Sequence, residues 1–561
     1  MGNSRNGHDT PAPVSTSPSN GVGASTWWRH GAVYQIYPRS FADSTGDGTG
    51  DIDGIRSRLP YLRDLGIDAI WICPWYTSPL NDGGYDVADY RAIDERFGDL
   101  AAAERLVSDA HDHDIRVIVD LVPNHTSSEH RWFRAALAAD PGSRERDRYI
   151  FRPGRGPDGS EPPNNWTAVF GGSAWKRVDD GEWYLHLFDP TQPDLNWENE
   201  EVRAEFDDIF RFWLDRGVDG FRIDVAHGLV KDASFPDLEV TEGLLESNRG
   251  FDHPYWDRDG IHEINRRWRS VLDSSGRDVM MVAEAWVQPT RLPLYLRPDE
   301  YHQSFNFDFL AAPWQLDDAR AAIDRAIDAA ASVGSAPTWV LSNHDVMRHT
   351  TRYGLPADAN WREWPLDGPH ELLDQELGTR RARAAALLLM ALPGSVYLYQ
   401  GEELGLPDVW DLPLDVLDDP VWENSGHRQK GRDGCRVPMP WTTDGPSYGF
   451  GAGSAWLPQP DSFAELSVEA QERTGGSSLT MYRSALELRG RLFTSDEAFD
   501  WIDAGPGMLA FRRGSGAACV VNFGPSAARL PDGDVLISST PLVDGLLPPD
   551  AAAWVTPGGH D

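Results

Sequence analysis

The sequence contains few cysteines and no long hydrophobic run. Cys73, Cys435 and Cys519 are the only cysteines among 561 residues. Their wide spacing argues against a disulfide framework, a structural zinc site or redox chemistry. No stretch approaches the roughly 20 uninterrupted apolar residues that a membrane span needs, and the first 26 residues lack the apolar segment of a secretion signal. We therefore expect a cytoplasmic protein that does not act at a membrane.

Lysine is scarce, and acidic residues greatly outnumber basic ones. Lysine occurs only at Lys176, Lys231 and Lys430, and 88 acidic residues against 51 Lys and Arg give a formal net charge of −37. Binding of nucleic acid or of anionic lipid depends on a basic patch that displaces counterions. The charge balance therefore argues against both of these partners and favours a neutral small molecule.

Length and composition indicate one large globular core. Hydrophobic residues make up 40% of the chain, which is enough for a large barrel with one or two smaller appendages. Residues 1–26 are instead rich in Pro, Ser, Gly and Asn. Because such a segment buries too little apolar surface to offset its ordering entropy, we predict a disordered tail there.

Eight short, β-rich apolar runs recur along the chain, and amphipathic segments of helical period separate most of them. This alternation predicts a parallel sheet, and eight such units close into a (β/α)8 TIM barrel. We assign the barrel to residues 27–125 and 200–492. The predicted strands lie at residues 33–36, 69–72, 117–122, 220–223, 279–282, 304–309, 339–341 and 395–399.

Two connections are too long to be simple turns. Residues 126–199, between the third and fourth predicted strands, are rich in Gly, Pro, Trp and Asp and predict an inserted domain over the barrel mouth. Residues 407–441 repeat this pattern on a smaller scale. Long barrel loops gather at the C-terminal face, where active sites form. Residues 493–561 alternate apolar and polar segments between Gly and Pro, which predicts a C-terminal antiparallel β domain.

Polar clusters follow four of the predicted strands. They are DLVPNH at residues 120–125, GFRID at 220–224, AEAW at 283–286 and SNHD at 342–345. A single acidic residue at a strand end is most often a helix cap or an ion-pair partner. Four clusters at the same end of one barrel are hard to assign to capping. They predict a catalytic site at the C-terminal rim of the barrel.

Cleavage of an acetal requires two carboxyl groups in different protonation states. Arg222 stands two residues before Asp224, on the same side of the strand, so its charge is expected to keep Asp224 ionised as the nucleophile. Glu284 has apolar neighbours in sequence, which should raise its pKa and keep it protonated as the general acid. Asp345, with His344 beside it, is placed to hydrogen-bond sugar hydroxyl groups.

The four clusters resemble the four signature regions of the α-amylase superfamily, glycoside hydrolase family 13, and the resemblance extends from about residue 28 to the C-terminus. It implies retaining hydrolysis of α-glucosidic bonds through a covalent glucosyl–aspartate intermediate. It further implies Asp224 as the nucleophile, Glu284 as the acid/base and Asp345 as the transition-state stabiliser. The residues that it implies to orient the nucleophile and to bind the sugar are Arg222, His125 and His344.

Further segments resemble the branch of that family that contains α-glucosidases and oligo-1,6-glucosidases. DGGYD at residues 82–86 resembles a loop in which Asp82 and Tyr85 contact the terminal glucose, and Arg436 in CRVPMPW resembles the arginine that pairs with Asp82. QPDLN at residues 192–196 resembles the version found in this branch. A pocket blocked in this way admits only a chain end. The resemblance therefore implies an exo-acting α-glucosidase that removes single glucose units.

The linkage preference stays open in the sequence. Val225 resembles the residue associated with α-1,6 cleavage, whereas Ala226 and His227 resemble a branch of maltose-hydrolysing α-glucosidases. We favour maltose and short α-1,4-glucosides as substrates, with isomaltose as the alternative. We expect the enzyme to be a monomer or a homodimer. A transglucosidase or sucrose isomerase would use the same intermediate. A barrel scaffold that has lost catalysis is a third alternative, against which the intact acids argue.

An acidic loop near the N-terminus suggests a metal site. Oxygen-bearing side chains alternate with tight turns there, an arrangement that suits a hard divalent cation, but Gly54 in the twelfth position excludes an EF-hand. The resemblance implies a structural Ca²⁺ or Mg²⁺ and no cofactor for catalysis, and a simple acidic turn is the alternative. The candidate ligands are Asp43, Thr45, Asp47, Thr49 and Asp51.

Overall fold

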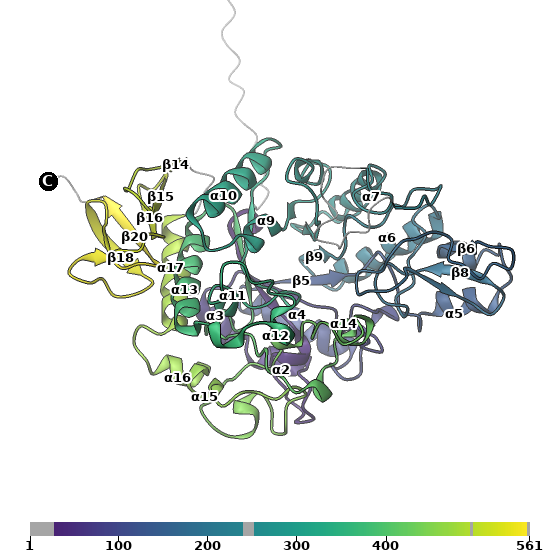
Figure 1. The fold of residues 1–561 in the computed structure, drawn as a ribbon, viewed down its shortest axis with the longest axis horizontal. Helices are drawn as coiled ribbons and strands as arrows, with labels where there is room; N and C mark the ends of the chain where they lie inside the picture. Colours follow the sequence, from purple (N-terminus) through teal and green to yellow (C-terminus); the bar gives the residue numbers. More distant parts are fainter. Residues whose placement is uncertain (1–26, 239–251, 494–497, 558–561) are drawn as a thin grey trace, which may run out of the picture.

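The computed structural model describes residues 27–238, 252–493 and 498–557 (Figure 1). The tail predicted for residues 1–26 lies outside these ranges. Eight parallel strands form the central sheet, in the order β11-β10-β9-β5-β2-β1-β13-β12. Their bounds are β1 Ala32–Ile36, β2 Ala69–Ile72, β5 Arg116–Leu121, β9 Gly220–Ile223, β10 Met280–Ala283, β11 Gln303–Ser304, β12 Thr338–Val340 and β13 Ser395–Tyr399.

The two end strands of this sheet, β11 and β12, are joined through side chains. The Thr338 hydroxyl donates to the carbonyl oxygen of Ser304, and the Ser335 hydroxyl donates to that of His302 at 3.2 Å. All residues of β1, β2 and β13 are buried, as expected for parallel strands covered on both faces. The sheet is a nearly closed barrel, and the predicted TIM barrel is confirmed.

Helices cover the outside of the barrel. Helix α4 begins after Asp99, whose carboxylate accepts from the Ala102 N–H, and α6 begins after Asn199, whose side chain accepts from the Glu201 N–H. None of the helices in the described ranges combines the length and the hydrophobicity needed to cross a membrane. The longer helices are α4 Leu100–Asp112, α6 Glu200–Leu214, α7 Ile261–Ser274, α10 Leu316–Ala331, α13 Gln375–Ala391 and α17 Ser478–Leu492.

The sixth predicted strand is largely wrong. The run at residues 304–309 was expected to be one strand, but β11 ends at Ser304 and helix α9 spans Phe307–Ala311. The side chain of Asn306 accepts from the Phe309 N–H and so caps this helix. A short run rich in phenylalanine is compatible with a strand or with a helix, and the capping residue Asn306 within this run favours the helix.

Two further parts lie on opposite sides of the barrel in Figure 1. After β5 the chain forms helix α5 (Arg131–Ala138) and a three-stranded sheet of β6 Phe151–Pro153, β8 Glu182–Leu185 and β7 Trp175–Arg177. At the C-terminal end, an antiparallel sheet packs on α13. In this interface the Trp554 indole N–H donates to the Leu387 carbonyl oxygen at 3.0 Å. The inserted subdomain and the C-terminal β domain are therefore present, while their exact limits stay predictions. The C-terminal strands are β14 Phe499–Trp501, β15 Met508–Arg513, β16 Ala518–Asn522, β20 Ala551–Pro557 and β18 Gly533–Ser538.

Candidate active site

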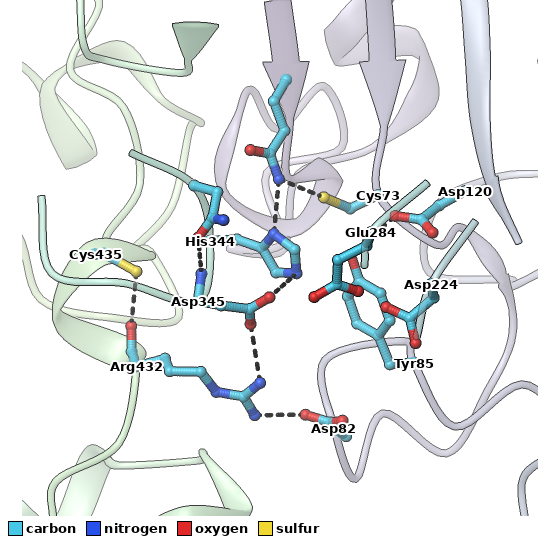
Figure 2. A network of polar contacts seen from close by, with 12 residues as sticks. Cys73, Asp82, Tyr85, Asp120, Asp224, Glu284, His344, Asp345, Arg432 and Cys435 are labelled. Carbon is cyan, nitrogen blue, oxygen red and sulfur yellow. Dashed lines mark hydrogen bonds and ion pairs between the residues drawn. The ribbon is translucent and has the colours of Figure 1, made fainter. Parts of the chain in front are cut away.

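Asp224 and Glu284 lie next to each other at the carboxyl ends of neighbouring strands. Ile223 of β9 pairs with Ala283 of β10, so the residue that follows each strand emerges at the same level of the rim. Both carboxyl groups line one cavity of about 340 Å³, and Figure 2 shows the two side chains beside one another. The strand ends thus bring together the two acids that the sequence predicts to act as a pair.

Arg222 connects the two carboxyl groups. Its guanidinium lies 2.6 Å from Asp224 Oδ1 and 2.7 Å from Glu284 Oε2. It also contacts Asp120 Oδ1 at 3.0 Å, because Asp120 of β5 lies in register with Arg222 of β9. Asp120 in turn accepts from the Tyr85 hydroxyl at 2.9 Å. Asp120 is therefore part of the site. In the sequence, only its position as the first residue of DLVPNH, near the end of a predicted strand, points to such a role.

Two opposing effects act on the carboxyl group of Asp224. Burial raises its pKa well above the usual range, Arg222 acts in the opposite direction, and Glu284 adds to the increase. Arg222 shares its charge with Asp120 and Glu284 as well, so it offsets only part of the effect of burial on Asp224. The assignment of Asp224 as the ionised nucleophile and of Glu284 as the protonated acid stays a prediction.

The surroundings of Glu284 are polar, not apolar as its sequence neighbours suggested. Besides Arg222, the Trp286 indole N–H donates to Glu284 Oε1 at 3.0 Å and the Val225 N–H donates to Oε2 at 3.1 Å. Val225 has φ 46°, a left-handed conformation that β-branched residues avoid and that costs about 1 to 3 kcal/mol. This strained turn directs the Val225 N–H at the acid/base, so Glu284 is held in one orientation.

Asp345 is held in its ionised form by positive neighbours. Its carboxylate lies 3.1 Å from His344 Nε2, 2.9 Å from Arg432 and 3.3 Å from Arg436. Burial alone would raise the pKa of Asp345, but its interactions with His344, Arg432 and Arg436 lower it well below its usual range, and the two arginines are the neighbours that stay positively charged. Burial lowers the pKa of His344 to about 3, and its ring stacks on Tyr85 with centroids 5.0 Å apart. A permanently ionised Asp345 suits a group that stabilises positive charge on a sugar ring.

An ion pair between Asp82 and Arg432 lies at one end of the cavity, where Arg432 is part of the lining. Arg432 reaches Asp82 Oδ1 at 2.6 Å, and Figure 2 shows it bridging Asp82 and Asp345. The predicted partner of Asp82, Arg436, instead donates to the His344 carbonyl oxygen at 2.9 Å and contacts Asp345. The predicted pairing is therefore wrong. The reason is local, because Arg432 precedes the short turn Asp433–Cys435 and Arg436 follows it, so the two guanidinium groups reach the pocket at different points.

His125 is linked to Asp82 through Gln192, a residue of the inserted domain. The Gln192 side-chain amide nitrogen lies 3.0 Å from Asp82 Oδ2 and 3.1 Å from His125 Nε2. Burial lowers the pKa of His125 to about 4, so the ring is neutral near neutral pH. Gln192 belongs to the QPDLN segment, which the sequence marked as a branch feature but not as part of the site.

Lys231 joins the inserted domain to the barrel beneath these residues. Its buried ammonium lies 2.7 Å from Asp194, 2.9 Å from the side-chain oxygen of Asn124 and 2.7 Å from the carbonyl oxygen of Gly228. Asp194 belongs to QPDLN, and Asn124 precedes His125. Lys231 therefore helps to hold the inserted domain on the catalytic rim, together with the hydrogen bond between the Leu195 N–H and the Asn124 carbonyl oxygen at 3.0 Å.

Comparison with known proteins agrees with this geometry. The family model for the catalytic domain of α-amylase matches residues 35–495. The chain belongs to the α-amylase family. It is therefore an enzyme of glycoside hydrolase family 13, as the four signature regions implied.

Relatives within the α-amylase family support the predicted branch. The chain is 37% identical to an oligo-1,6-glucosidase of Parageobacillus thermoglucosidasius over 496 residues, 82% of this chain and 83% of that protein. It is 37% identical to a probable α-glucosidase of Rhizobium meliloti (strain 1021) over 525 residues, 90% of each chain. Among solved structures, the α-glucosyl transfer enzyme XgtA superposes with a TM-score of 0.81 at 34% identity, covering 95% of this chain and 100% of that one. An isomaltulose synthase of Erwinia rhapontici NX5 does so with a TM-score of 0.81 at 30% identity, with the same coverage.

In this member of the α-amylase family, apolar side chains make up a large part of the cavity lining. The indole of Trp286 is backed by Phe307, with parallel rings whose centroids are 3.7 Å apart. The Trp286 N–H contacts Glu284, which places this wall beside the acid/base. The other apolar residues that line the cavity include Val169, Phe170, Val346, Met347 and Trp361.

The loop predicted to hold a metal has carboxylates that bind their own backbone. Asp43 accepts from the N–H groups of Thr45 and Gly48 at 2.9 Å each, and Asp51 accepts from Ser44 and Gly54 at 2.7 Å each. In the described ranges, no three His, Cys, Asp or Glu side chains are grouped so that they could hold a metal ion. As arranged, Asp43, Thr45, Asp47, Thr49 and Asp51 do not fit a cation cage, and the structural Ca²⁺ or Mg²⁺ stays a prediction.

Proposed function

We propose that this enzyme is an exo-acting α-glucosidase that releases glucose from the non-reducing end of short α-glucosides with retention of anomeric configuration. One observation supports this most strongly. Asp224 and Glu284 face one cavity that Arg432 also lines, and Arg432 is bound to Asp82; we infer that this ion pair closes that end of the cavity. A cavity with one open side admits a single terminal sugar next to the acid pair.

The closure involves three separate parts of the chain. Asp82 comes from the loop after β2, and Arg432 comes from the long loop after β13. Phe170 of the inserted domain lies beneath the Arg432 guanidinium, 4.9 Å from the ring centroid. The Asn424 side chain also donates to Asp189 of the inserted domain at 2.6 Å. Because these contacts join the inserted domain to the long loop, an internal unit of a polysaccharide has no path through the pocket.

The proposed reaction uses the acid pair in two steps. Glu284 donates its proton to the glycosidic oxygen while Asp224 attacks the anomeric carbon, which gives a glucosyl–Asp224 ester and releases the leaving sugar. Glu284 then takes a proton from water, whose oxygen displaces Asp224. Arg222 contacts both carboxyl groups throughout, and Asp345 binds the hydroxyl groups of the flattened ring.

Glucosyl transfer to a second sugar is the alternative within the same chemistry. It is favoured by the structural likeness to an α-glucosyl transfer enzyme, an isomaltulose synthase and a trehalulose synthase. Both reactions share the glucosyl–Asp224 intermediate and differ in the acceptor. We place hydrolysis first, because curated relatives of similar identity include oligo-1,6-glucosidases and an α-glucosidase. The linkage preference, the cytoplasmic location and the monomeric or homodimeric state stay predictions.

The proposal is tested with a panel of substrates. Initial rates of glucose release are measured on maltose, isomaltose, sucrose, trehalose and maltotriose. Formation of oligosaccharides at high maltose concentration separates transfer from hydrolysis. Release of glucose from maltose or isomaltose as the main reaction supports the proposal. If the wild-type enzyme releases no glucose from any of these sugars or from 4-nitrophenyl α-glucoside, the scaffold alternative is correct.

A further inference from the structure

His227 is a buried polar residue whose ring nitrogens make no hydrogen bond with the described part of the protein. It lies three residues after Asp224 and lines the catalytic cavity. Its side chain is 1% exposed, and neither Nδ1 nor Nε2 has a hydrogen-bond partner among residues 27–238, 252–493 and 498–557. Nearly all buried polar groups in folded proteins have such a partner. Two unpaired ring nitrogens in the wall of a substrate cavity therefore point to a bound ligand as the missing partner.

Neighbouring groups hold the ring but leave its nitrogen atoms unpaired. The imidazole stacks on Trp256, with centroids 4.9 Å apart and planes at 25°. The carbonyl oxygen of Glu284, which accepts from the Ala226 N–H at 2.9 Å, lies close enough to the ring to raise the pKa of His227 against the larger effect of burial, but no hydrogen bond of normal geometry joins it to either ring nitrogen. Lys231, four residues further along, binds Asp194, Asn124 and Gly228 instead. The ring is therefore fixed in place before any ligand binds.

The position of His227 corresponds to the leaving-group side of the cavity. The segment from Val225 to His227 packs against Glu284, since the Val225 N–H donates to its carboxylate and the Ala226 N–H to its carbonyl oxygen. Glu284 is the group that protonates the leaving oxygen. The closed end of the cavity is formed by Asp82 and Arg432, with which His227 shares no hydrogen bond or ion pair. A ligand contact made by His227 therefore falls on the part of the substrate that departs.

The chemistry of the ring suits a sugar hydroxyl group. Burial lowers the pKa of His227 to about 4, so the imidazole is neutral at neutral pH and offers one donor and one acceptor. A hydroxyl group also donates and accepts, whereas the ring of an aryl leaving group has no O–H or N–H to donate to the imidazole. The other groups that contact Glu284 or line the cavity near it include the apolar rings of Trp286 and its neighbour Phe307. His227 is thus well placed to distinguish a sugar from an aryl group.

We propose that His227 is a specificity-determining residue that hydrogen-bonds a hydroxyl group of the leaving sugar. This inference rests on the proposed α-glucosidase function and adds to it the residue that recognises the leaving group. It predicts that removal of the two nitrogens harms cleavage of glucobioses and spares cleavage of aryl glucosides.

The test compares His227→Phe with the wild-type enzyme on maltose, isomaltose and 4-nitrophenyl α-glucoside. Phenylalanine keeps a ring to stack on Trp256 and lacks both nitrogens. We expect kcat/KM on the better glucobiose to fall about five- to tenfold, the effect of one or two neutral hydrogen bonds. We expect kcat/KM on the aryl glucoside to change by less than about twofold.

The matched control is His186→Phe. His186 is also buried, at 2% exposed, and its Nδ1 has no partner, but it does not line the catalytic cavity. It should leave both activities and their ratio unchanged. If His227→Phe does not fold, as judged by its thermal unfolding midpoint, His227→Ala replaces it and should show the same selective loss.

Each outcome decides the inference. A selective loss on the glucobiose, absent in His186→Phe, supports it. An equal loss on both substrates, or no loss on either, overturns it, because His227 would then have a structural role or no contact with the leaving group. These results differ from failure of the proposed function, in which the wild-type enzyme itself releases no glucose.

Discussion

Replacement of Arg432 by methionine should impair both stability and catalysis, because three carboxylates share this arginine. Its guanidinium lies 2.6 Å from Asp82, 2.6 Å from Asp419 and 2.9 Å from Asp345. Asp82 and Asp419 are buried, whereas the side chain of Asp345 is 27% exposed to the cavity. Methionine keeps an apolar stem against Phe170 and removes the charge. The substitution Arg432→Met therefore leaves two buried acids and Asp345 with much less compensating charge.

The magnitude follows from the burial of these groups. Removal of one partner from a buried ion pair costs about 3 to 5 kcal/mol of stability. Asp345 also loses one of the arginines that keep its pKa low, and a loss of about 3 kcal/mol of transition-state stabilisation lowers kcat/KM roughly 10²-fold. If Asp82 is the partner of Arg432, then Asp82→Asn and Arg432→Met together lose less than the sum of the single changes, by about 1 to 3 kcal/mol.

A double-mutant cycle measures this coupling. Initial rates on 4-nitrophenyl α-glucoside and thermal unfolding midpoints are collected for the wild type, both single variants and the double variant. The comparison cycle combines Asp82→Asn with Arg436→Met, and Arg63→Met serves as a surface control, since Arg63 and Asp64 are 51% and 59% exposed. Additive effects for Arg432 together with strong coupling for Arg436 would show that the assignment of the closing ion pair is wrong.

Three further predictions concern the nucleophile, the anchor of the inserted domain and a buried acid. Asp224→Asn should lower kcat on 4-nitrophenyl α-glucoside by roughly 10³-fold or more with little change in the unfolding midpoint; comparable activity would refute its role. Lys231→Met should destabilise the protein by about 3 to 5 kcal/mol, because it leaves Asp194 buried without its counter-charge; an unchanged unfolding midpoint would contradict this. Burial raises the pKa of Glu402 from its ordinary value of 4.5 to about 8. Between these two pH values the folded protein keeps the carboxyl proton, whereas the unfolded chain releases it. The free energy of unfolding should therefore decline by a few kcal/mol from this group as the pH rises from about 4.5 to about 8. Glu402→Gln should therefore raise the unfolding midpoint more at pH 8 than at pH 5, and an equal effect at both pH values would exclude the raised pKa.

The barrel and the acid pair could be predicted because they depend on local patterns. Each strand is a short apolar run, and parallel register carries the residue after each run to the same rim. Asp224 and Glu284 therefore meet wherever β9 and β10 pair as they do. The failure at residues 304–309 has the same origin, since an apolar run alone does not tell a strand from a short helix that Asn306 caps.

The ion pair of Asp82 with Arg432 and the polar surroundings of Glu284 could not be predicted in the same way. Asp82 and Arg432 are 350 residues apart, and their contact depends on how the long loop after β13 folds over the mouth. The sequence does not tell which of the two arginines of that loop, Arg432 or Arg436, reaches Asp82. The turn between them directs the two guanidinium groups to different points of the pocket. The polar surroundings of Glu284 likewise come from other strands and loops and not from its sequence neighbours.

The anomeric configuration of the first product tests the central claim most directly. Asp224 as nucleophile and Glu284 as acid/base require two displacements at the anomeric carbon, with carboxyl groups about 5 to 5.5 Å apart. Proton NMR spectra recorded during the first minutes of maltose or isomaltose hydrolysis distinguish the anomers before mutarotation. The account predicts that α-glucose appears first; initial appearance of β-glucose would contradict it.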